Sequence, residues 1–172
     1  LELLAAKYST YDEAAMARFA DALRRRPPSL LFGHAHSLYL FAEFLLATRR
    51  ADIRPRGIIS GAMVLHDWER RLLEDVFQCR VTNRYGCEEV SLIACECERH
   101  EGLHVNADAI YLEVLRCDGT PAAPGEPGMV VVTDLVNRAM PLLRYQVGDM
   151  AVANGRECSC GRGLPLLDRV DG

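Results

Sequence analysis

Apolar residues recur at helical spacing in the first half of the chain. Over residues 14–23 they repeat at three- and four-residue intervals, as on one face of an amphipathic helix. Thr10 followed by Glu13 is a capping box that opens this helix, and Pro27 with Pro28 ends it. Two further helices are predicted over residues 36–48 and 66–77, the second with Trp68 on its core side, and three short strands over residues 29–32, 56–60 and 80–83.

The pattern changes near residue 90, where strands follow one another without a helix between them. Turn signals such as Asp118-Gly119 and Asn154-Gly155 separate these runs, which favours antiparallel hairpins curling into a small barrel or twisted sheet. The predicted strands cover residues 90–95, 110–115, 129–135, 142–146 and 150–153.

The two halves together predict an α/β protein. Strands that alternate with helices form a parallel sheet with crossover helices, here followed by a small antiparallel β-barrel-like subdomain. We place the boundary near Glu98, which gives an α/β subdomain over residues 1–97 and a β-rich subdomain over residues 98–172.

Composition narrows the classes of protein that this chain can represent. Of the 172 residues, 49% are hydrophobic and 26% are charged, which is typical of a globular protein that buries its own core. The formal net charge of -4 argues against nucleic acid as a partner, and no apolar stretch reaches the length of a membrane span. Seven cysteines without a disulfide-scaffold spacing favour a reducing cytoplasm. Both ends look cut, so we expect a piece of a longer chain; its oligomeric state stays open.

Two short segments carry the chemistry of a nucleotide site. Residues 85–89 and 144–149 each place a carboxylate beside a glycine turn and an aromatic ring. A ring can stack on a base, one carboxylate can hold a metal ion, and another can accept hydrogen bonds from ribose hydroxyls. Ligands usually bind where the strands of a parallel sheet end, and Ser60-Gly61-Ala62 and Tyr85-Gly86 both follow predicted strands. The alternative is that these are ordinary strand-to-helix turns.

The order and spacing of these segments resemble the adenylate-forming enzymes, the superfamily of acyl-CoA synthetases and related ligases. Residues 57–62 and 81–89 look like the adenine-binding stretch, and residues 125–135 and 141–149 look like the later ribose-binding stretch. Within that superfamily the chain is similar to the phenylacetate–coenzyme A ligase family. Its nearest branch is the ligase-like proteins of capsular polysaccharide synthesis, to which residues 137–141 and 158–165 point.

The resemblance implies a role for each matching residue. Tyr85 would stack on or flank the adenine beside Gly86, and Asp149 would accept hydrogen bonds from both ribose hydroxyls. Glu89 would hold the magnesium ion that bridges the phosphates. The alternatives are a solvated loop carboxylate for Glu89 and a turn-capping residue for Asp149. Three small residues would line the base through their backbone, namely Ser60, Gly61 and Ala62.

The implied activity belongs to a larger protein. A ligase of this kind uses ATP to activate a carboxylic acid as acyl-AMP and passes the acyl group to a thiol such as coenzyme A. No Gly/Ser/Thr-rich phosphate loop precedes residue 57, and the domain with the catalytic lysine would begin beyond Gly172, so we expect this chain alone to be inactive. Gln146 also stands where the family usually has Arg. The alternative function is a zinc-stabilised, non-catalytic binding or scaffold domain that retains the ligase fold.

Four residues of the second half could form a closed zinc site. Cys97, His104, Cys158 and Cys160 supply the soft and borderline ligands of a tetrahedral structural zinc. The resemblance to the ligase family also implies a structural zinc, which some of its members carry at matching positions. His100 is a rival for His104, and the alternative is a set of free thiols with a surface imidazole. The other cysteines are expected to pack as small apolar groups; they are Cys79, Cys87, Cys95 and Cys117.

Overall fold

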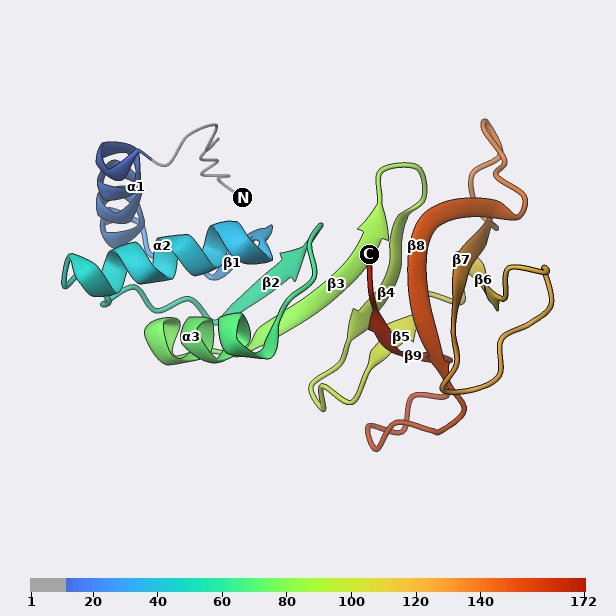
Figure 1. Cartoon of the computed structure of the whole chain (residues 1–172). Coiled ribbons are helices and arrows are strands. Elements are labelled where there is room, and N and C mark those ends of the chain that lie inside the picture. The colour runs from blue at the N-terminus through green and yellow to red at the C-terminus, as the bar shows by residue number, and fades with distance from the viewer. Residues whose placement is uncertain (1–11) are drawn as a thin grey trace. The chain divides into compact units, whose positions relative to one another are not determined.

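The computed structural model describes residues 12–172 and confirms the α/β class with a mixed sheet (Figure 1). The elements of the first half are α1 (Glu13–Arg25), β1 (Leu30–His34), α2 (Ala35–Ala47), β2 (Gly57–Gly61), α3 (Asp67–Phe77) and β3 (Val81–Cys87). Those that follow are β4 (Ser91–Glu96), β5 (Leu103–Val105), β6 (Ile110–Leu115), β7 (Pro127–Asp134), β8 (Tyr145–Asn154) and β9 (Leu166–Val170). Within residues 12–172 no helix has both the length and the apolar character needed to cross a membrane.

The chain forms two compact units. The first contains the described residues up to Ile59 together with Leu65–Val81, and the second contains Ser60–Val64 and Thr82–Gly172. This division differs from the boundary expected between residues 97 and 98. The physical reason is that β3 does not end at residue 83 but continues to Cys87 and pairs with β4, so the β-rich unit starts within β3.

Helices and strands of the first unit enclose one apolar core. Each of its helices buries one face, with Ala20, Leu45 and Leu73 fully shielded from solvent. The rings of Phe41 on α2 and Phe77 on α3 stack with their centroids 6.3 Å apart. Asp12 caps α1 by accepting a hydrogen bond from the backbone of Ala14, whereas Thr10 of the predicted capping box lies outside the described residues.

The prediction that Trp68 lies in the core is wrong, because its side chain is 52% exposed. The buried face of α3 follows the sequence Glu69, Leu73, Val76, and Trp68 lies about 100° around the helix from that row. Its ring stacks on His66 instead. Glu69 occupies the buried position and is satisfied by the His66 backbone N–H at 3.1 Å and by His36 Nδ1 at 3.2 Å. A buried carboxylate therefore replaces the expected aromatic ring.

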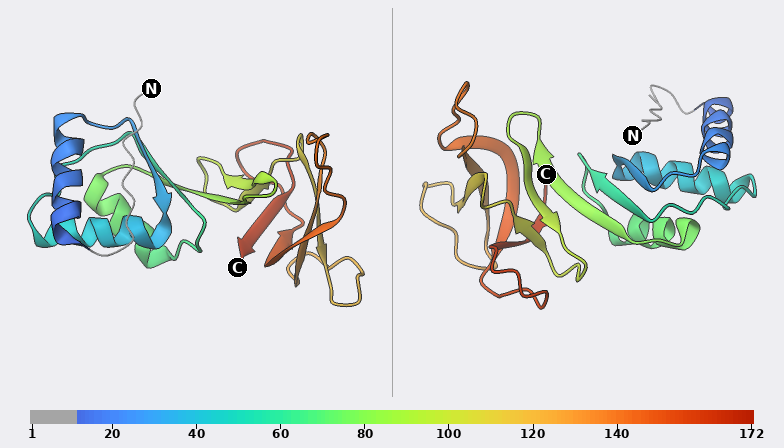
Figure 2. Two further views of the ribbon diagram at one scale, coloured as in Figure 1. Left: turned by 90° about the horizontal axis from the view of Figure 1, so that it is seen from above. Right: turned by 180° about the vertical axis from the view of Figure 1, so that it is seen from behind.

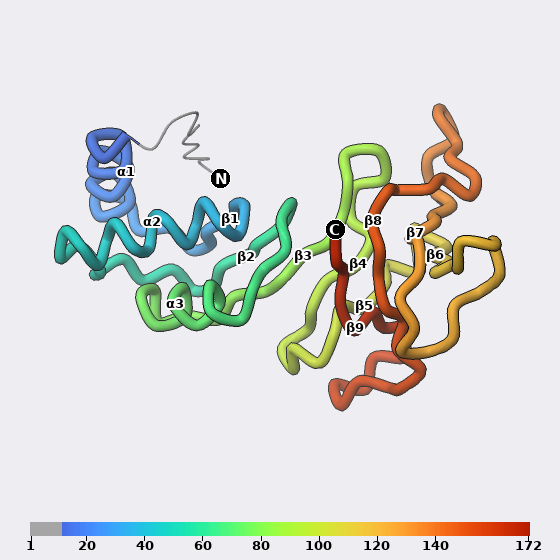
Figure 3. The backbone as a smooth tube through the Cα atoms, viewed as in Figure 1, coloured from blue at the N-terminus to red at the C-terminus, as the bar shows by residue number. Residues whose placement is uncertain are grey.

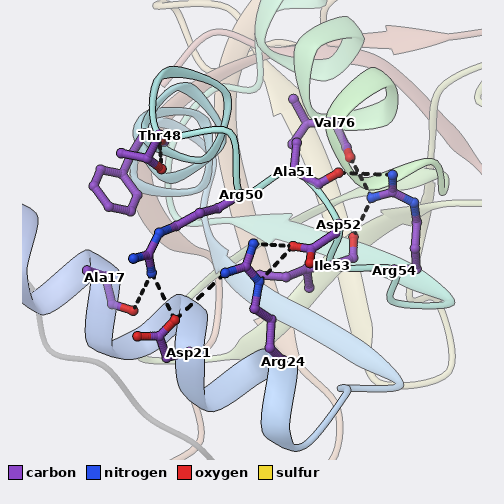
Figure 4. A network of polar contacts seen from close by, with 11 residues as sticks. Ala17, Asp21, Arg24, Thr48, Arg50, Ala51, Asp52, Ile53, Arg54 and Val76 are labelled. Carbon is purple, nitrogen blue, oxygen red and sulfur yellow. Dashed lines mark hydrogen bonds and ion pairs between the residues drawn. The ribbon is translucent and has the colours of Figure 1, made fainter.

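Ion pairs join α1 to the segment that follows α2 (Figure 4). Arg50 donates to Asp21 at 2.8 Å, and Arg24 contacts Asp52 at 2.7 Å. These side chains are partly exposed, so the pairs contribute little to stability and mainly fix the position of the segment before β2.

The second unit is an antiparallel sheet. Its strand order is β3-β4-β5-β9-β8-β7-β6, and each neighbouring pair from β3 onward runs antiparallel. The sequence predicted two strands where β8 runs unbroken over 10 residues, and it missed β5 and β9. Strand β8 bends along its length (Figure 2), and register shifts interrupt its pairing with β7 and β9. One face covers a second core that includes Ile93, Val130 and Val132.

The buried face of α3 gives a test of the first core. Leu73→Ala should lower the free energy of unfolding by about 2–5 kcal/mol, because it leaves a cavity among fully buried side chains. The matched change Leu46→Ala removes a side chain that is 48% exposed and should alter stability by less than about 0.5 kcal/mol. Urea unfolding monitored by circular dichroism measures both, and equal effects would contradict this description of the core.

Candidate functional site

The first of the two segments lies at the β3–β4 hairpin, which Figure 3 traces through its turn. Tyr85 and Gly86 belong to β3, and Glu89 lies in the turn at residues 88–90. The pairing of β3 with β4 shifts register between Tyr85 and Gly86. A Cβ atom on Gly86 would lie 2.0 Å from the carbonyl oxygen of Ser91, so only glycine permits this close approach. The irregularity sets the direction in which Tyr85 and the turn point.

Tyr85 and Asp149 meet across 64 residues of sequence. The Tyr85 hydroxyl donates to Asp149 Oδ2 at 2.7 Å. Burial of the phenol, followed by its hydrogen bond to the Asp149 carboxylate, raises the pKa of Tyr85 well above its usual range, so it stays a hydrogen-bond donor. Asp149 follows Gly148, which has a φ of 103°, but both lie within β8 rather than in a turn.

A second hydrogen bond joins the two segments, with its donor in the second segment and its acceptor in the first. The Tyr145 hydroxyl donates to Glu89 Oε1 at 2.8 Å. Hydrogen bonds from the backbone of Glu89, from Tyr145 and from the Cys87 thiol lower the pKa of the exposed Glu89 carboxyl. Each tyrosine thus binds the carboxylate of the other segment, and both candidate ligand carboxylates are held in one site.

The three small residues expected to line the base belong to the same unit. Ser60 and Gly61 end β2, and a Cβ on Gly61 would lie 3.2 Å from the carbonyl oxygen of Arg84 on β3. Ala62 follows with a φ of 60°, in the left-handed region. Ser60 is fully buried, and its Oγ has no hydrogen-bond partner among the described residues. Backbone groups of β2 and β3 therefore lie close together next to Tyr85.

Cys97, His104, Cys158 and Cys160 form a compact cluster in the second unit. Their ligand atoms all lie within 4.8 Å of one another, and Cys97 Sγ is 3.6 Å from Cys158 Sγ. The distance between Cys160 Sγ and His104 Nε2 is 3.4 Å. Around a tetrahedral zinc ion with Zn–S bonds of about 2.3 Å, neighbouring sulfurs lie about 3.8 Å apart. The donor set and its spacing fit a four-coordinate zinc.

Backbone and side-chain contacts hold this cluster in place. The amides of Arg99 and Arg162 donate to the sulfurs of Cys97 and Cys160 at 3.4 and 3.5 Å. Hydrogen bonds, first that of the Arg162 amide, lower the pKa of the Cys160 thiol, whereas the pKa of its neighbour Cys158 is raised. The cluster therefore favours a thiolate, the form that binds metal, at Cys160. The carboxylate of Glu101 accepts hydrogen bonds from the Ser159 backbone at 3.0 Å and from its hydroxyl at 2.7 Å.

Of the two rival histidines, His104 lies in the cluster. It is buried on β5, and its Nδ1 has no hydrogen-bond partner among the described residues. His100 instead contacts Glu96 at 2.9 Å. The geometry therefore favours His104 as the fourth ligand.

Comparison with known proteins identifies the superfamily of this chain. No protein-family model matches the chain. The phenylacetate-coenzyme A ligase of Thermus thermophilus is 36% identical in an alignment of 142 positions that covers 72% of this chain and 32% of that protein. The protein CapK of Staphylococcus aureus is 26% identical over 132 residues, or 76% of this chain and 28% of CapK. The chain belongs to the adenylate-forming superfamily.

Solved structures confirm the fold of this superfamily member. A 2-hydroxyisobutyryl-CoA ligase, solved with an acyl-AMP and CoA, matches with a TM-score of 0.83. The match covers 92% of this chain and 39% of the ligase at 20% sequence identity. The chain spans about a third of the length of the curated relatives that it matches.

The prediction that the four cysteines outside the cluster pack as small apolar groups holds only in part. None of the seven cysteines forms a disulfide. Burial raises the pKa of Cys79, Cys87 and Cys95, as expected for thiols that pack as small apolar groups. Cys117 differs because it is exposed on the turn after β6.

Sequence reasoning gave the Tyr145 hydroxyl no hydrogen-bond partner. In the structure it donates to Glu89 Oε1. Tyr145 is 56 positions away from its partner, so no local signal could have linked the two.

The hairpin yields a test of the site's framework. Gly86→Ala should destabilise the second unit by roughly 1–3 kcal/mol, since the new methyl group forces the Ser91 carbonyl to move. Gly163→Ala is the matched control, because a Cβ there meets no described atom within 4 Å. Urea unfolding of both variants decides the point. Equal stabilities would show that the hairpin tolerates a side chain at Gly86.

Proposed function

We propose that this chain forms the adenine, metal and ribose side of the adenylate pocket of an ATP-dependent ligase. The whole protein would activate a carboxylic acid as acyl-AMP, release pyrophosphate, and transfer the acyl group to a thiol such as coenzyme A. The observation that carries the proposal is the reciprocal pairing of the two segments, which gathers Tyr85, Glu89 and Asp149 in one unit. The sequence similarity to phenylacetate-coenzyme A ligases supports it.

The proposed roles follow the chemistry of each group. The ring of Tyr85 would flank the adenine, and the backbone of Ser60, Gly61 and Ala62 would line its edge. Asp149 would bind the ribose, since a carboxylate has about four lone-pair sites and can accept the Tyr85 hydroxyl together with ribose hydroxyls. These contacts would orient the nucleotide before any bond is made.

Glu89 is the proposed protein ligand for magnesium. Its carboxylate is exposed in the β3–β4 turn. This suits a hard cation that takes most of its oxygen ligands from water and phosphate and needs one or two carboxylates. When bound, magnesium would neutralise charge on the phosphates.

The substrates of the whole protein are proposed from its relatives. A hydrophobic or aromatic acid fits the similarity to phenylacetate-coenzyme A ligases, whereas the similarity to CapK is compatible with another acid. Coenzyme A is the proposed acceptor. A cytoplasmic location is proposed because the odd number of cysteines and their spacing are not those of a disulfide scaffold.

A structural zinc is proposed for the second unit. Cys97 follows β4, His104 lies on β5, and Cys158 and Cys160 lie between β8 and β9. A zinc ion bound there would join two loops of the sheet and would have no open position for a substrate. This closed ligand set is also the observation that favours the second candidate function, a zinc-stabilised scaffold that retains the fold without the reaction.

Pyrophosphate exchange tests the ligase proposal. The full-length protein should exchange labelled pyrophosphate into ATP with at least one acid from a panel of aromatic and aliphatic carboxylic acids that includes phenylacetate. Glu89→Gln should lower the exchange rate on the order of 100-fold, because the amide is a poor magnesium ligand.

The control for this exchange assay is Glu88→Gln, which changes the neighbouring exposed carboxylate in the same turn and should leave the rate within about two-fold of the wild type. Exchange at the wild-type rate in Glu89→Gln would refute the magnesium role. Absence of exchange with every acid would refute the ligase proposal itself.

Metal analysis and AMP binding separate the two candidate functions. We expect one zinc per chain, and Cys158→Ser should lose the metal and lower Tm by roughly 10 °C or more. Cys117→Ser, at an exposed thiol outside the cluster, should retain both zinc and Tm. The ligase proposal also predicts AMP binding, measured by calorimetry, that Asp149→Ala weakens. Zinc without AMP affinity would support the scaffold, and a metal-free wild-type chain would refute the zinc site.

A further inference from the structure

Glu89 lies on an exposed turn, where a glutamate side chain would ordinarily sample several rotamers. A donor from another strand restricts it in this structure. The Tyr145 hydroxyl lies 2.8 Å from Glu89 Oε1. Tyr145 belongs to β8 and Glu89 follows β3, and these two strands are not neighbours in the sheet.

The sheet fixes the position of the Tyr145 ring. Tyr145 is the first residue of β8 and pairs with Val132 of β7. Its half-buried ring packs against the second core. The residue before it is anchored as well, because the Arg144 amide donates to Thr133 Oγ1 at 3.0 Å and its guanidinium contacts Glu113 at 3.0 Å. The phenol hydroxyl is therefore held in a fixed position, whereas the glutamate side chain that accepts its hydrogen bond could otherwise sample several rotamers.

We propose that Tyr145 is a positioning residue that orients Glu89 for a divalent cation. The inference rests on the proposed function, in which Glu89 is the metal ligand. A hydrogen bond to one carboxylate oxygen leaves the other oxygen to the cation and removes the rotamer entropy that metal binding would otherwise cost. Outer contacts of this kind typically change metal affinity by about 10–100-fold.

The same geometry makes the two segments interdependent. Tyr145 belongs to the segment that holds the ribose-binding candidate Asp149, and Tyr85 belongs to the segment that holds Glu89. Each carboxylate is thus oriented by a hydroxyl from the opposite segment. A shift of β8 relative to the β3–β4 hairpin would disturb the metal ligand and the ribose ligand together.

Tyr145→Phe tests the inference because it removes the hydroxyl and keeps the ring in the core. In the full-length protein with ATP, Mn²⁺ binding measured by electron paramagnetic resonance should weaken on the order of 10-fold. In pyrophosphate exchange, the apparent KM for Mg²⁺ should rise by a similar factor, while the rate at saturating Mg²⁺ stays within about two-fold of the wild type. A purely structural role would not produce this separation of KM from kcat.

Matched variants make the test specific. Tyr111→Phe removes the hydroxyl of an exposed tyrosine on β6 and should leave metal affinity unchanged. Adding Tyr145→Phe to Glu89→Gln should cost no further metal affinity, since the oriented carboxylate is already gone.

Each outcome supports or overturns the inference. Unchanged metal affinity in Tyr145→Phe, an additive double variant, or a wild-type protein that binds no Mn²⁺ would overturn it. A wild-type protein without exchange activity but with a Tyr145-dependent Mn²⁺ site would refute the ligase proposal and support the inference. Exchange activity that does not depend on Tyr145 would support the ligase proposal and refute the inference.

Discussion

The close approach of Gly86 to the Ser91 carbonyl is the constraint on which the candidate site depends. It permits the shift in register between β3 and β4 at the point where Tyr85 leaves the regular ladder. Irregular pairing of this kind redirects side chains and is common beside functional sites. Here it allows the Tyr85 hydroxyl to reach Asp149 on β8, and it leaves Glu89 in a turn that Tyr145 can reach. A side chain at Gly86 would displace both groups at once.

The four residues of the cysteine–histidine cluster lie on or between strands of the same sheet. Strand β8 carries Asp149 and leads directly into the loop with Cys158 and Cys160, and that loop leads into β9. Strand β9 pairs with β5, which carries His104. A metal bound to these ligands would thus hold the end of β8 through its neighbours, where backbone pairing between β5 and β9 is short. We regard the cluster as part of the framework of the proposed nucleotide site rather than as a separate activity.

Membership in the adenylate-forming superfamily and the geometry of the second unit are consistent with each other. The proposed nucleotide site needs a ring, two carboxylates and backbone groups, and the residues that would supply them lie in one unit with its own core. The first unit contributes a different kind of polar feature, the buried Glu69 that His36 and the start of α3 satisfy. Its carboxylate is a structural element, since the N–H groups at a helix start are unpaired without such a cap.

Local patterns in the sequence determined the three helices, the change from helix-rich to strand-rich chain, the two candidate nucleotide segments and the four metal-ligand candidates. These follow from periodicity, turn residues and side-chain chemistry, which act over a few positions. Tertiary structure alone decided that β3 continues to Cys87, that β8 is one bent strand, that Glu69 rather than Trp68 is buried, and that β5 and β9 exist. It also decided which tyrosine meets which carboxylate. The reason is that strand pairing depends on the whole sheet and leaves no trace in neighbouring residues. The same holds for the two tyrosine–carboxylate hydrogen bonds, whose partners lie 56 and 64 positions apart in the sequence.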